Sequence, residues 1–143
     1  MSWQDSFLDL LLEAAPSPNT IFLAEPYDNE RSLREATIRD ALKAYRVLVA
    51  EEQITNLDFL HKVIRQIQTA DYGIADLTGH NPNVLLELGI MYGMRRPALL
   101  LLMGPETSTF PSNIKGIEQV RYRDYLELGN KLQNAMANVF SGH

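Results

Sequence analysis

The residues best suited to chemistry lie in one stretch, DLTGHNPNVLLELGIMYGM, which runs from position 76 to position 94. An apolar run that ends in Asp76 is typical of a buried strand, and Asn81 before a proline is typical of a helix start. Asn83 and Glu87 are the polar side chains of that helix, and at four residues apart they share one face. Because an isolated ionised carboxylate is costly on a buried helix, we interpret Glu87 as a candidate functional residue. The alternative is a solvated helix glutamate.

The helix that carries Glu87 is otherwise apolar nearly all round, and such helices belong in the interior of a protein rather than at its surface. Gly89 and Gly93, again four residues apart, give this helix a smooth strip. We therefore predict that the helix packs closely against a sheet, with the glycine strip at the contact.

Short apolar runs alternate with helical stripes along the rest of the chain. Strands are predicted at Thr20–Ala24, Arg46–Ala50, Tyr72–Ala75, Ala98–Leu102 and Ile117–Tyr122. The first intervening helix is predicted to end near Tyr45, with an inward face of Leu33, Ile38, Ala41, Leu42 and Tyr45. The next helix is predicted to open at a capping box of Thr55 and Asp58. The last helix is predicted to place on one stripe Leu128, Leu132, Met136 and Val139.

Strands that alternate with helices in this way are typical of a doubly wound α/β domain with a parallel sheet. We predict a flavodoxin-like three-layer sandwich whose five strands follow the order 2-1-3-4-5. In that order the switch point lies between strands 1 and 3, and ligands bind outside the carboxyl ends of these strands. The loops 25–31 and 76–83 meet there, which brings Tyr27, Asp28 and Arg31 to the mouth of the helix that carries Glu87.

Two segments stand apart from this alternation. Residues 1–18 combine a helical pattern with many large apolar side chains, so we predict an N-terminal amphipathic helix before an α/β domain at 19–143. This helix packs on the flank of the domain or, as the alternative, docks on a partner or a second copy. Residues 104–116 form a Pro/Ser/Thr-rich loop, and its length suggests a lid or an interaction loop.

Composition narrows the classes of function. The chain has 143 residues, 45% hydrophobic and 22% charged, which are ordinary values for one globular domain. A formal net charge of -5 with scattered basic residues argues against nucleic-acid binding. The sequence has no cysteine, no basic signal region at its N-terminus and no apolar run long enough to span a bilayer. We therefore expect a soluble cytoplasmic protein without a nucleic-acid or membrane partner.

Familiar cofactor and catalytic motifs are missing from the sequence, which has no glycine-rich phosphate loop, serine nucleophile elbow or paired-histidine metal motif. We expect no metal and no cofactor. What is left suits the cleavage of an N-glycosidic bond, since one carboxylate beside an anomeric carbon can stabilise an oxocarbenium-like transition state or trap it covalently. The candidate roles are catalysis for Glu87, base stacking for Tyr27, ribose binding for Asp76 and Asn81, substrate binding for Asp28, substrate binding or orientation of Glu87 for Asn83, and phosphate or local acid binding for Arg31.

The run from Asp76 to Gly89, D-L-T-G-H-N-P-N-V-L-L-E-L-G, resembles the nucleotide-binding TIR-like proteins of bacterial defence systems. These proteins are similar in fold to TIR domains and to nucleoside 2-deoxyribosyltransferases. The stretch from Phe22 to Tyr27 resembles the opening strand and Pro-aromatic pair of the same family. The resemblance spans about residues 20–140 and implies that residues 19–143 form a TIR-like nucleotide-binding domain. By position, Glu87 matches the glutamate with which TIR NADases cleave NAD+ and which deoxyribosyltransferases use as a nucleophile.

Asn81 departs from the deoxyribosyltransferase pattern, which has a carboxylate at this position. A neutral base usually needs a proton as it leaves, whereas the nicotinamide of NAD+ is already cationic and leaves unaided. A site with one glutamate and a nearby amide therefore suits NAD+ better than a plain nucleoside, although Asp28 or Asp76 could restore the missing acid.

From these residues and this resemblance we predict a TIR-like NAD+ glycohydrolase of bacterial defence, with NAD+ as the substrate. One alternative is a nucleoside or nucleotide N-glycosidase or deoxyribosyltransferase. Another is a non-catalytic module that senses nucleotides or assembles with a partner. The resemblance also implies a homo-oligomer or a subunit of a larger defence system.

Overall fold

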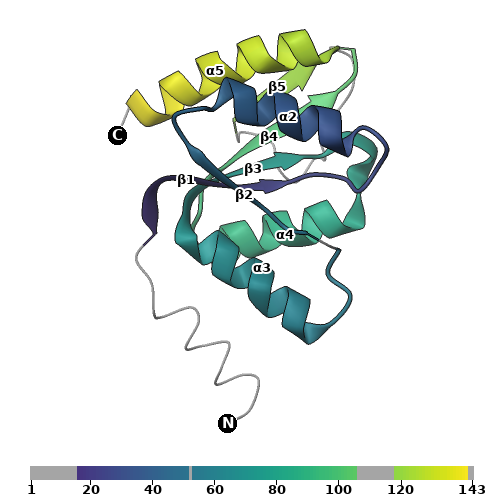
Figure 1. Ribbon diagram of the computed structural model, residues 1–143, viewed down its shortest axis with the longest axis vertical. Helices are drawn as coiled ribbons and strands as arrows, with labels where there is room; N and C mark the ends of the chain where they lie inside the picture. Colours follow the sequence, from purple (N-terminus) through teal and green to yellow (C-terminus); the bar gives the residue numbers. More distant parts are fainter. Residues whose placement is uncertain (1–15, 52, 106–117, 142–143) are drawn as a thin grey trace.

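Five parallel strands form the centre of the molecule, in the order β2-β1-β3-β4-β5 (Figure 1). The computed structural model describes residues 16–51, 53–105 and 118–141. The strands are β1 (Ser17–Ala24), β2 (Arg46–Val49), β3 (Ala70–Asp76), β4 (Ala98–Met103) and β5 (Gln119–Tyr122). Every neighbouring pair is parallel, so the predicted strand order is confirmed.

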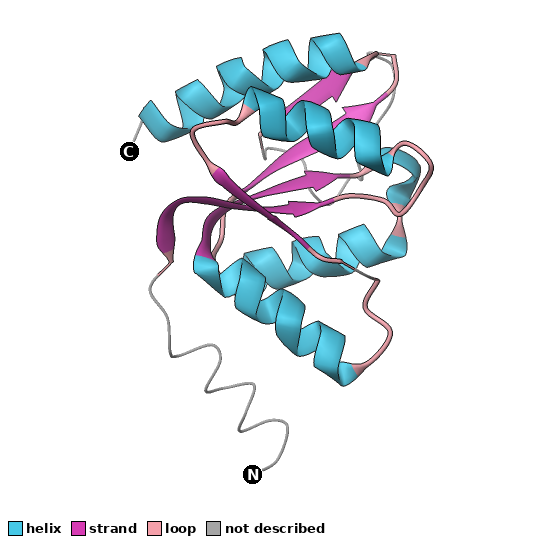
Figure 2. Ribbon diagram, viewed as in Figure 1, coloured by secondary structure: helices cyan, strands magenta, loops and turns pink. Residues whose placement is uncertain are grey.

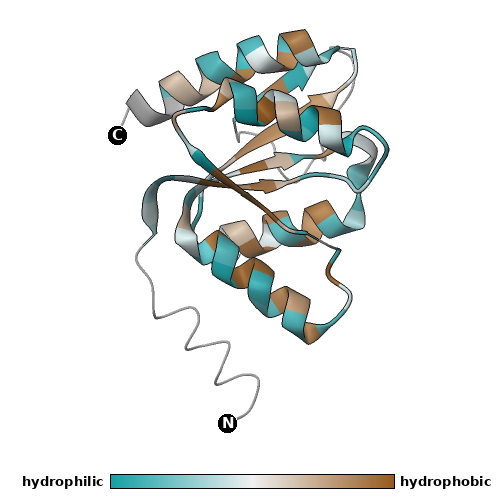
Figure 3. Cartoon of the chain, viewed as in Figure 1, coloured by the Kyte–Doolittle hydropathy of each residue, from teal (hydrophilic) through white to brown (hydrophobic). Residues whose placement is uncertain are grey.

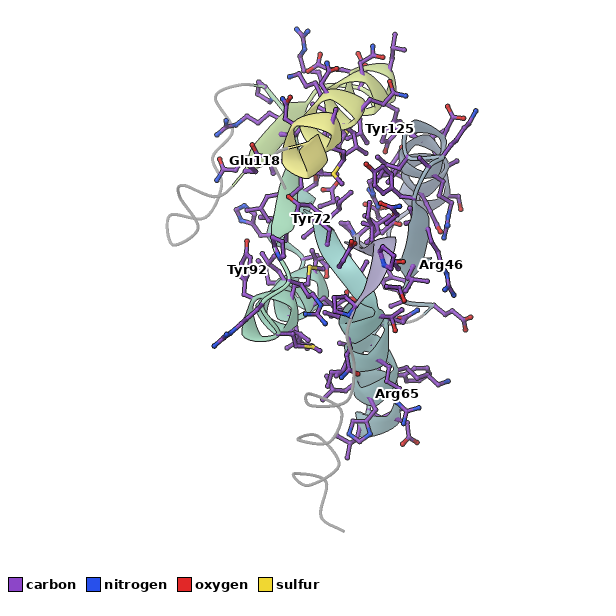
Figure 4. All side chains as sticks on the ribbon, turned by 90° about the vertical axis from the view of Figure 1, so that its left-hand side faces the viewer. Arg46, Arg65, Tyr72, Tyr92, Glu118 and Tyr125 are labelled. Atoms are coloured by element: carbon purple, nitrogen blue, oxygen red, sulfur yellow. The ribbon has the colours of Figure 1, made fainter. Side chains whose placement is uncertain are left out.

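Four helices cover the two faces of this sheet (Figure 2). Helices α2 (Arg31–Ala41) and α5 (Tyr125–Ser141) lie on one face, and α3 (Leu57–Thr69) and α4 (Pro82–Gly93) lie on the other. The Tyr125 hydroxyl donates a hydrogen bond of 3.0 Å to Oε2 of Glu30, which joins α5 to the start of α2 (Figure 4). The result is the predicted three-layer sandwich.

Two apolar cores, one on each face, hold the layers together. Strand β4 is buried from Ala98 to Leu102, as its continuous apolar sequence predicts, and it contributes alternate side chains to both cores. Figure 3 shows brown, apolar ribbon along the central strands and mixed teal and brown stretches on α2 and α3. This pattern fits helices that bury one stripe and expose the other.

Strand β1 begins at Ser17, earlier than the predicted Thr20, despite the two prolines around it. Ser17 is in register with Ala70 of β3, and the pairing shifts before Ile21. Asn19, which has a φ of 53°, lies at this irregularity. Its backbone N–H and that of Thr20 each donate a bond of 3.2 Å to the Asp71 carboxylate. A side chain therefore replaces the missing ladder bonds, and the strand extends through sequence that normally ends one.

Helix α2 differs from its predicted form in length and in its inward face. It ends at Ala41 rather than near Tyr45, because Leu42 leaves the helical conformation as it caps the end. Ile38 and Leu42 are buried as predicted, but Leu33 is 55% exposed. Arg34 is buried instead, which no apolar periodicity indicates.

The start of α3 also corrects a prediction. The N-cap is Asn56, whose side chain accepts a 3.0 Å bond from the Phe59 N–H, so the predicted capping box at Thr55 and Asp58 is wrong. Asn is at least as good an N-cap as Thr. Starting the helix one residue later does not change which of its side chains face the sheet.

Helix α4 is not buried all round as predicted, because it lies in an outer layer of the sandwich. Leu85 and Leu86 are 38% and 49% exposed. Gly89 and Gly93 are exposed too, and no atom lies within 4 Å of where their Cβ would be, so the predicted glycine contact is wrong. The close approach is at Gly73 of β3, where a Cβ would collide with the sulfur of Met91.

Three predicted features lie outside the described residues: most of the N-terminal helix at 1–18, most of the loop at 104–116, and the side chain of Val139. Within the described ranges, no helix combines the length and the apolar character that a bilayer crossing requires.

Candidate active site

The carboxyl ends of β1 and β3, where topology predicts the crevice, are neighbours in the sheet. Glu25 follows β1 directly, and a short 3-10 turn, η1 (Thr78–His80), leads from β3 to α4. Gly79 takes a φ of 73° within this turn, a conformation that glycine adopts without strain. The turn therefore places the N-terminus of α4 beside the loop that follows β1.

Glu87 is buried on the inward face of α4, with only 1% of its surface exposed. Its Oε1 accepts a hydrogen bond of 2.8 Å from the Asn83 amide. Its Oε2 is also buried, but it has no hydrogen-bond partner among the described residues. Burial raises the pKa of Glu87 to about 8, with a further rise from Glu25 and an opposing effect from the Arg31 charge. Such a carboxyl exchanges its proton near neutral pH.

Two asparagines fix the position of the Glu87 carboxyl. The Asn81 Oδ1 accepts bonds from the N–H groups of Asn83 and Val84, so it caps α4 as predicted. The Asn83 Oδ1 accepts a 2.9 Å bond from the Ile54 N–H while its amide donates to Glu87. Asn83 therefore connects the catalytic candidate to the segment after β2, and its orientation is fixed from both sides.

Tyr27, in the loop after β1, and Arg31, the first residue of α2, form a stacked pair, with the Arg31 guanidinium 3.7 Å from the centre of the Tyr27 ring. The Tyr27 hydroxyl and Arg31 Nη2 donate to the same Ala50 carbonyl, at 2.7 and 2.6 Å. The Nη1 of Arg31 is buried and has no hydrogen-bond partner within the described part of the chain. Burial raises the pKa of Tyr27, and the charges of Glu87 and Glu25 raise it further, so this pair lies within electrostatic reach of both carboxyls.

Arg34 binds three carboxylates at the base of the crevice. Its Nε lies 3.2 Å from Oε1 of Glu25 and 3.9 Å from Oδ2 of Asp76, and its Nη2 lies 2.9 Å from Oδ1 of Asp28. Burial opposes its positive charge, but the bond to Asp28 and the charges of Asp76 and Glu25 outweigh burial and raise the Arg34 pKa. Arg34 is thus a permanent cation in a low-dielectric interior.

Asp76, predicted to hold a ribose, lies wholly in the interior. Its Oδ2 accepts a 2.6 Å bond from the Tyr122 hydroxyl, and its Oδ1 accepts a 2.9 Å bond from the Thr78 N–H. Burial and the nearby Asp76 charge raise the pKa of Tyr122, which keeps its proton in this bond. Contact between Asp76 and a ribose stays a prediction, since both oxygens already accept hydrogen bonds here.

Asp28 lies at the exposed rim of the crevice, where its hydrogen bonds from Arg34 hold the pKa of its carboxyl below the usual range. The structure thus bonds Asn83 to Glu87, brings Tyr27 and Arg31 within electrostatic reach of Glu87, and leaves Asp28 exposed. Sequence reasoning missed Arg34 and did not select Glu25 for the site. Only the place of Glu25, directly after a buried strand, gave a signal.

Two hollows flank the segment that follows β2. One, of about 330 Å³, is lined by Gln53, Ile54, Asn81, Pro82, Asn83 and Leu86. The other, of about 400 Å³, is lined by Ala50, Glu51, Phe59, Lys62, Val63, Arg65 and Gln66. Glu87 lines neither of them, but Asn83 borders the first and bonds to Glu87, so that hollow is the nearer to the catalytic candidate. Among the described residues, no group of His, Asp and Glu side chains is arranged to hold a metal ion.

No family model matches this sequence, and no curated protein matches it. Solved structures do share its fold. A 2-deoxyribosyltransferase from Bacillus psychrosaccharolyticus superposes with a TM-score of 0.58 at 20% identity, covering 78% of this chain and 90% of that one. The CMP N-glycosidase of Clostridium botulinum gives 0.63 at 22% identity, covering 81% and 98%. A Thermotoga maritima flavoprotein gives 0.62 at 10% identity, covering 93% of this chain but 38% of its own.

These similarities establish the fold, at identities too low to carry an activity from one protein to another. The first two structures share the fold that the resemblance seen in the sequence implies. None of the three is a TIR domain, so the TIR-specific part of that resemblance stays a prediction.

Proposed function

We propose that this protein cleaves the N-glycosidic bond of a nucleoside or nucleotide, with Glu87 as the carboxylate that acts at the anomeric carbon. The observation that carries the proposal is the state of Glu87. Its carboxyl is buried, Asn83 holds one oxygen, and the other has no hydrogen-bond partner among the described residues. A carboxylate buried without a full set of partners destabilises a fold, and such groups are concentrated at functional sites.

The chemistry follows from the two oxygens of Glu87. As the bond from C1' to the base breaks, positive charge develops on the ribose ring, and a carboxylate beside it stabilises or captures that cation. Asn83 fixes Oε1, so Oε2 is the oxygen that faces the sugar. The reaction requires the ionised form of Glu87. Burial raises its pKa to about 8 and leaves this form in the minority at neutral pH, while the Arg31 charge favours it.

The pair of Tyr27 and Arg31 suits the rest of a nucleotide. The Tyr27 ring is a stacking surface for a base. The Nη1 of Arg31, which has no hydrogen-bond partner among the described residues, is a donor for a phosphate or a ribose hydroxyl. Because Glu87 is covered, a substrate reaches it only if neighbouring side chains move. This pair, held to the protein by two bonds to one carbonyl, is the group that we expect to open.

Two solved structures of this fold support the same class of reaction by their names, one a deoxyribosyltransferase and the other a CMP N-glycosidase. A hydrolase passes the sugar to water, and a transferase passes it to a second base. Both outcomes need the same carboxylate, so the proposal covers both.

NAD+ is a second candidate substrate, in keeping with the sequence-based prediction. It is favoured by Asn81, a neutral amide whose oxygen is occupied as the cap of α4. A cationic leaving group needs no acid at this position. Under this alternative the carboxylate chemistry at Glu87 is unchanged and only the departing base differs.

The test is the release of free base, separated by chromatography, from CMP, deoxynucleosides and NAD+. Wild type is compared with Glu87→Gln, which keeps the shape and removes the ionisable group. Glu127→Gln is the matched control, because Glu127 lies in the first turn of α5 and is paired with Lys131 of that helix and with Arg123 just before it. A labelled free base in the mixture separates transfer from hydrolysis.

We expect wild type and Glu127→Gln to release base at equal rates and Glu87→Gln to lose at least about 100-fold in kcat. Faster release from CMP or a deoxynucleoside than from NAD+ would favour the first reading, and the reverse would favour the second. The proposal would be wrong if wild type released no base from any of them, or if Glu87→Gln matched wild type.

A further inference from the structure

Three carboxylates share the single buried guanidinium of Arg34: those of Glu25, Asp28 and Asp76. Water screens the exposed Asp28, but Glu25 and Asp76 are buried, and one positive charge cannot balance two buried negative charges in a low-dielectric interior. A cluster of this kind lowers its energy by keeping a proton on one of its carboxyls. The structure indicates which one.

Asp76 accepts a hydrogen bond at each oxygen, from the Tyr122 hydroxyl and from the Thr78 N–H. Asp28 lies at the solvent-exposed rim with a lowered pKa, so it stays ionised. Glu25 is 2% exposed and accepts a hydrogen bond from Arg34 at Oε1. Its Oε2 is buried and has no hydrogen-bond partner among the described residues. Burial raises its pKa to about 7, against the lowering effect of Arg34. Among these three carboxyls Glu25 is therefore the proton carrier. The reactive form pairs its proton with an ionised Glu87, and this is a minor form at neutral pH because the Glu87 pKa is the higher of the two.

Glu25 also lies within electrostatic reach of Glu87. It follows Ala24, which is in register with Ala75 at the carboxyl end of β3. Arg31 lowers the pKa of both carboxyls, and the charge of Glu25 raises that of Glu87. The charged and titratable groups that face Glu25 come from four elements: Arg31, Arg34 and Glu35 of α2, Tyr27 and Asp28 of the loop, Asp76 of β3, and Glu87 of α4.

We infer that Glu25 is a second catalytic carboxyl, the general acid that protonates the departing base. This inference rests on the proposed N-glycosidic cleavage. The bond from C1' to the base nitrogen breaks, its electron pair goes to that nitrogen, and the nitrogen takes the proton of Glu25. Glu87 stabilises or captures C1'. Water then attacks C1' and returns a proton to Glu25, so the net reaction is hydrolysis and both carboxyls recover their starting state.

This role changes the argument about the substrate. The preference for NAD+ came from the lack of an acid near Asn81, for which Asp28 or Asp76 were the candidates to substitute. Glu25 suits the role of this acid better than Asp28 or Asp76. It is buried, its pKa is raised to about 7, and its Oε2 has no hydrogen-bond partner among the described residues. With an acid in place, neutral bases such as cytosine become accessible leaving groups.

The experiment compares two substrates that share ribose 5-phosphate but differ in the base. CMP needs a proton on its leaving cytosine, whereas nicotinamide mononucleotide releases a base that needs none. For Glu25→Gln we expect kcat/KM to fall about 10²- to 10⁴-fold on CMP, the usual range for loss of a general acid, and less than about tenfold on nicotinamide mononucleotide. Glu87→Gln should lose both reactions.

Equal losses on both substrates in Glu25→Gln would assign Glu25 a purely structural role, and full activity on both would exclude it as the acid; either result overturns the inference. If wild type cleaved neither nucleotide, nor any substrate in the base-release test, the proposed function itself would fail. If Glu25→Gln does not fold, the wild-type pH profile decides. On CMP, kcat/KM should decline at alkaline pH as Glu25 loses its proton, and on nicotinamide mononucleotide it should not. Identical alkaline limbs would also overturn the inference.

Discussion

Glu87 should make the stability of the protein fall as the pH rises, and Glu87→Gln should remove that dependence. Burial raises the pKa of Glu87 from its ordinary 4.5 to about 8. Because the folded state holds this proton more tightly than the unfolded chain, the contribution to stability is fully present below about pH 4.5. It is lost as the pH rises through 8.

The magnitude is large for a single group. At about 1.4 kcal/mol per pH unit, a shift of this size corresponds to about 5 kcal/mol of unfolding free energy between the two limits. The whole stability of a domain is typically about 5–15 kcal/mol, so wild type should be markedly weakened at alkaline pH. Since Gln does not titrate, Glu87→Gln should gain several kcal/mol over wild type between pH 5 and pH 9.

Urea unfolding followed by far-ultraviolet circular dichroism, at pH 5, 7 and 9, measures the difference. Glu25 titrates in both proteins and largely cancels. The control is Glu127→Gln: hydrogen bonds from Lys131 and Arg123 lower the pKa of Glu127, so its contribution to stability is lost only in acid. The difference between this control and wild type should be flat from pH 5 to pH 9. Parallel curves for Glu87→Gln and wild type would refute the view that Glu87 is an under-compensated buried carboxyl.

Three more substitutions test the network around the site. Arg34→Met leaves its carboxylates without a counterion, so unfolding free energy at pH 7 should fall by about 3–5 kcal/mol in urea; a loss below about 1 kcal/mol would contradict this. Tyr122→Phe removes the donor to a buried Asp76 oxygen and should cost about 1.5–3 kcal/mol in the same assay; an unchanged urea midpoint would show that another donor replaces it. Asn83→Ala releases Glu87 and should lower kcat about 10- to 100-fold in the base-release assay, and an unchanged kcat would mean that other groups orient Glu87.

The sequence determined the fold class because periodicity is a local property of the chain. The apolar runs from Thr20 and from Ala98 marked strands, and their alternation with helices led to the observed strand order. The start of α4 was also local, since Asn81 caps it and Pro82 is its first residue. The four-residue spacing of Asn83 and Glu87 put them on one face, where the structure shows them hydrogen-bonded.

Only the tertiary structure decided which face of α4 turned inward. The composition of the helix suggested burial all round, but one face of a helix in an outer layer meets water, and that face carries Leu85 and Leu86. Arg34 took an inward position because Glu25 and Asp28 of the preceding loop and the sequence-distant Asp76 of β3 surround its guanidinium. No local pattern encodes such a cluster, since its energy depends on charges that only the folded chain brings together.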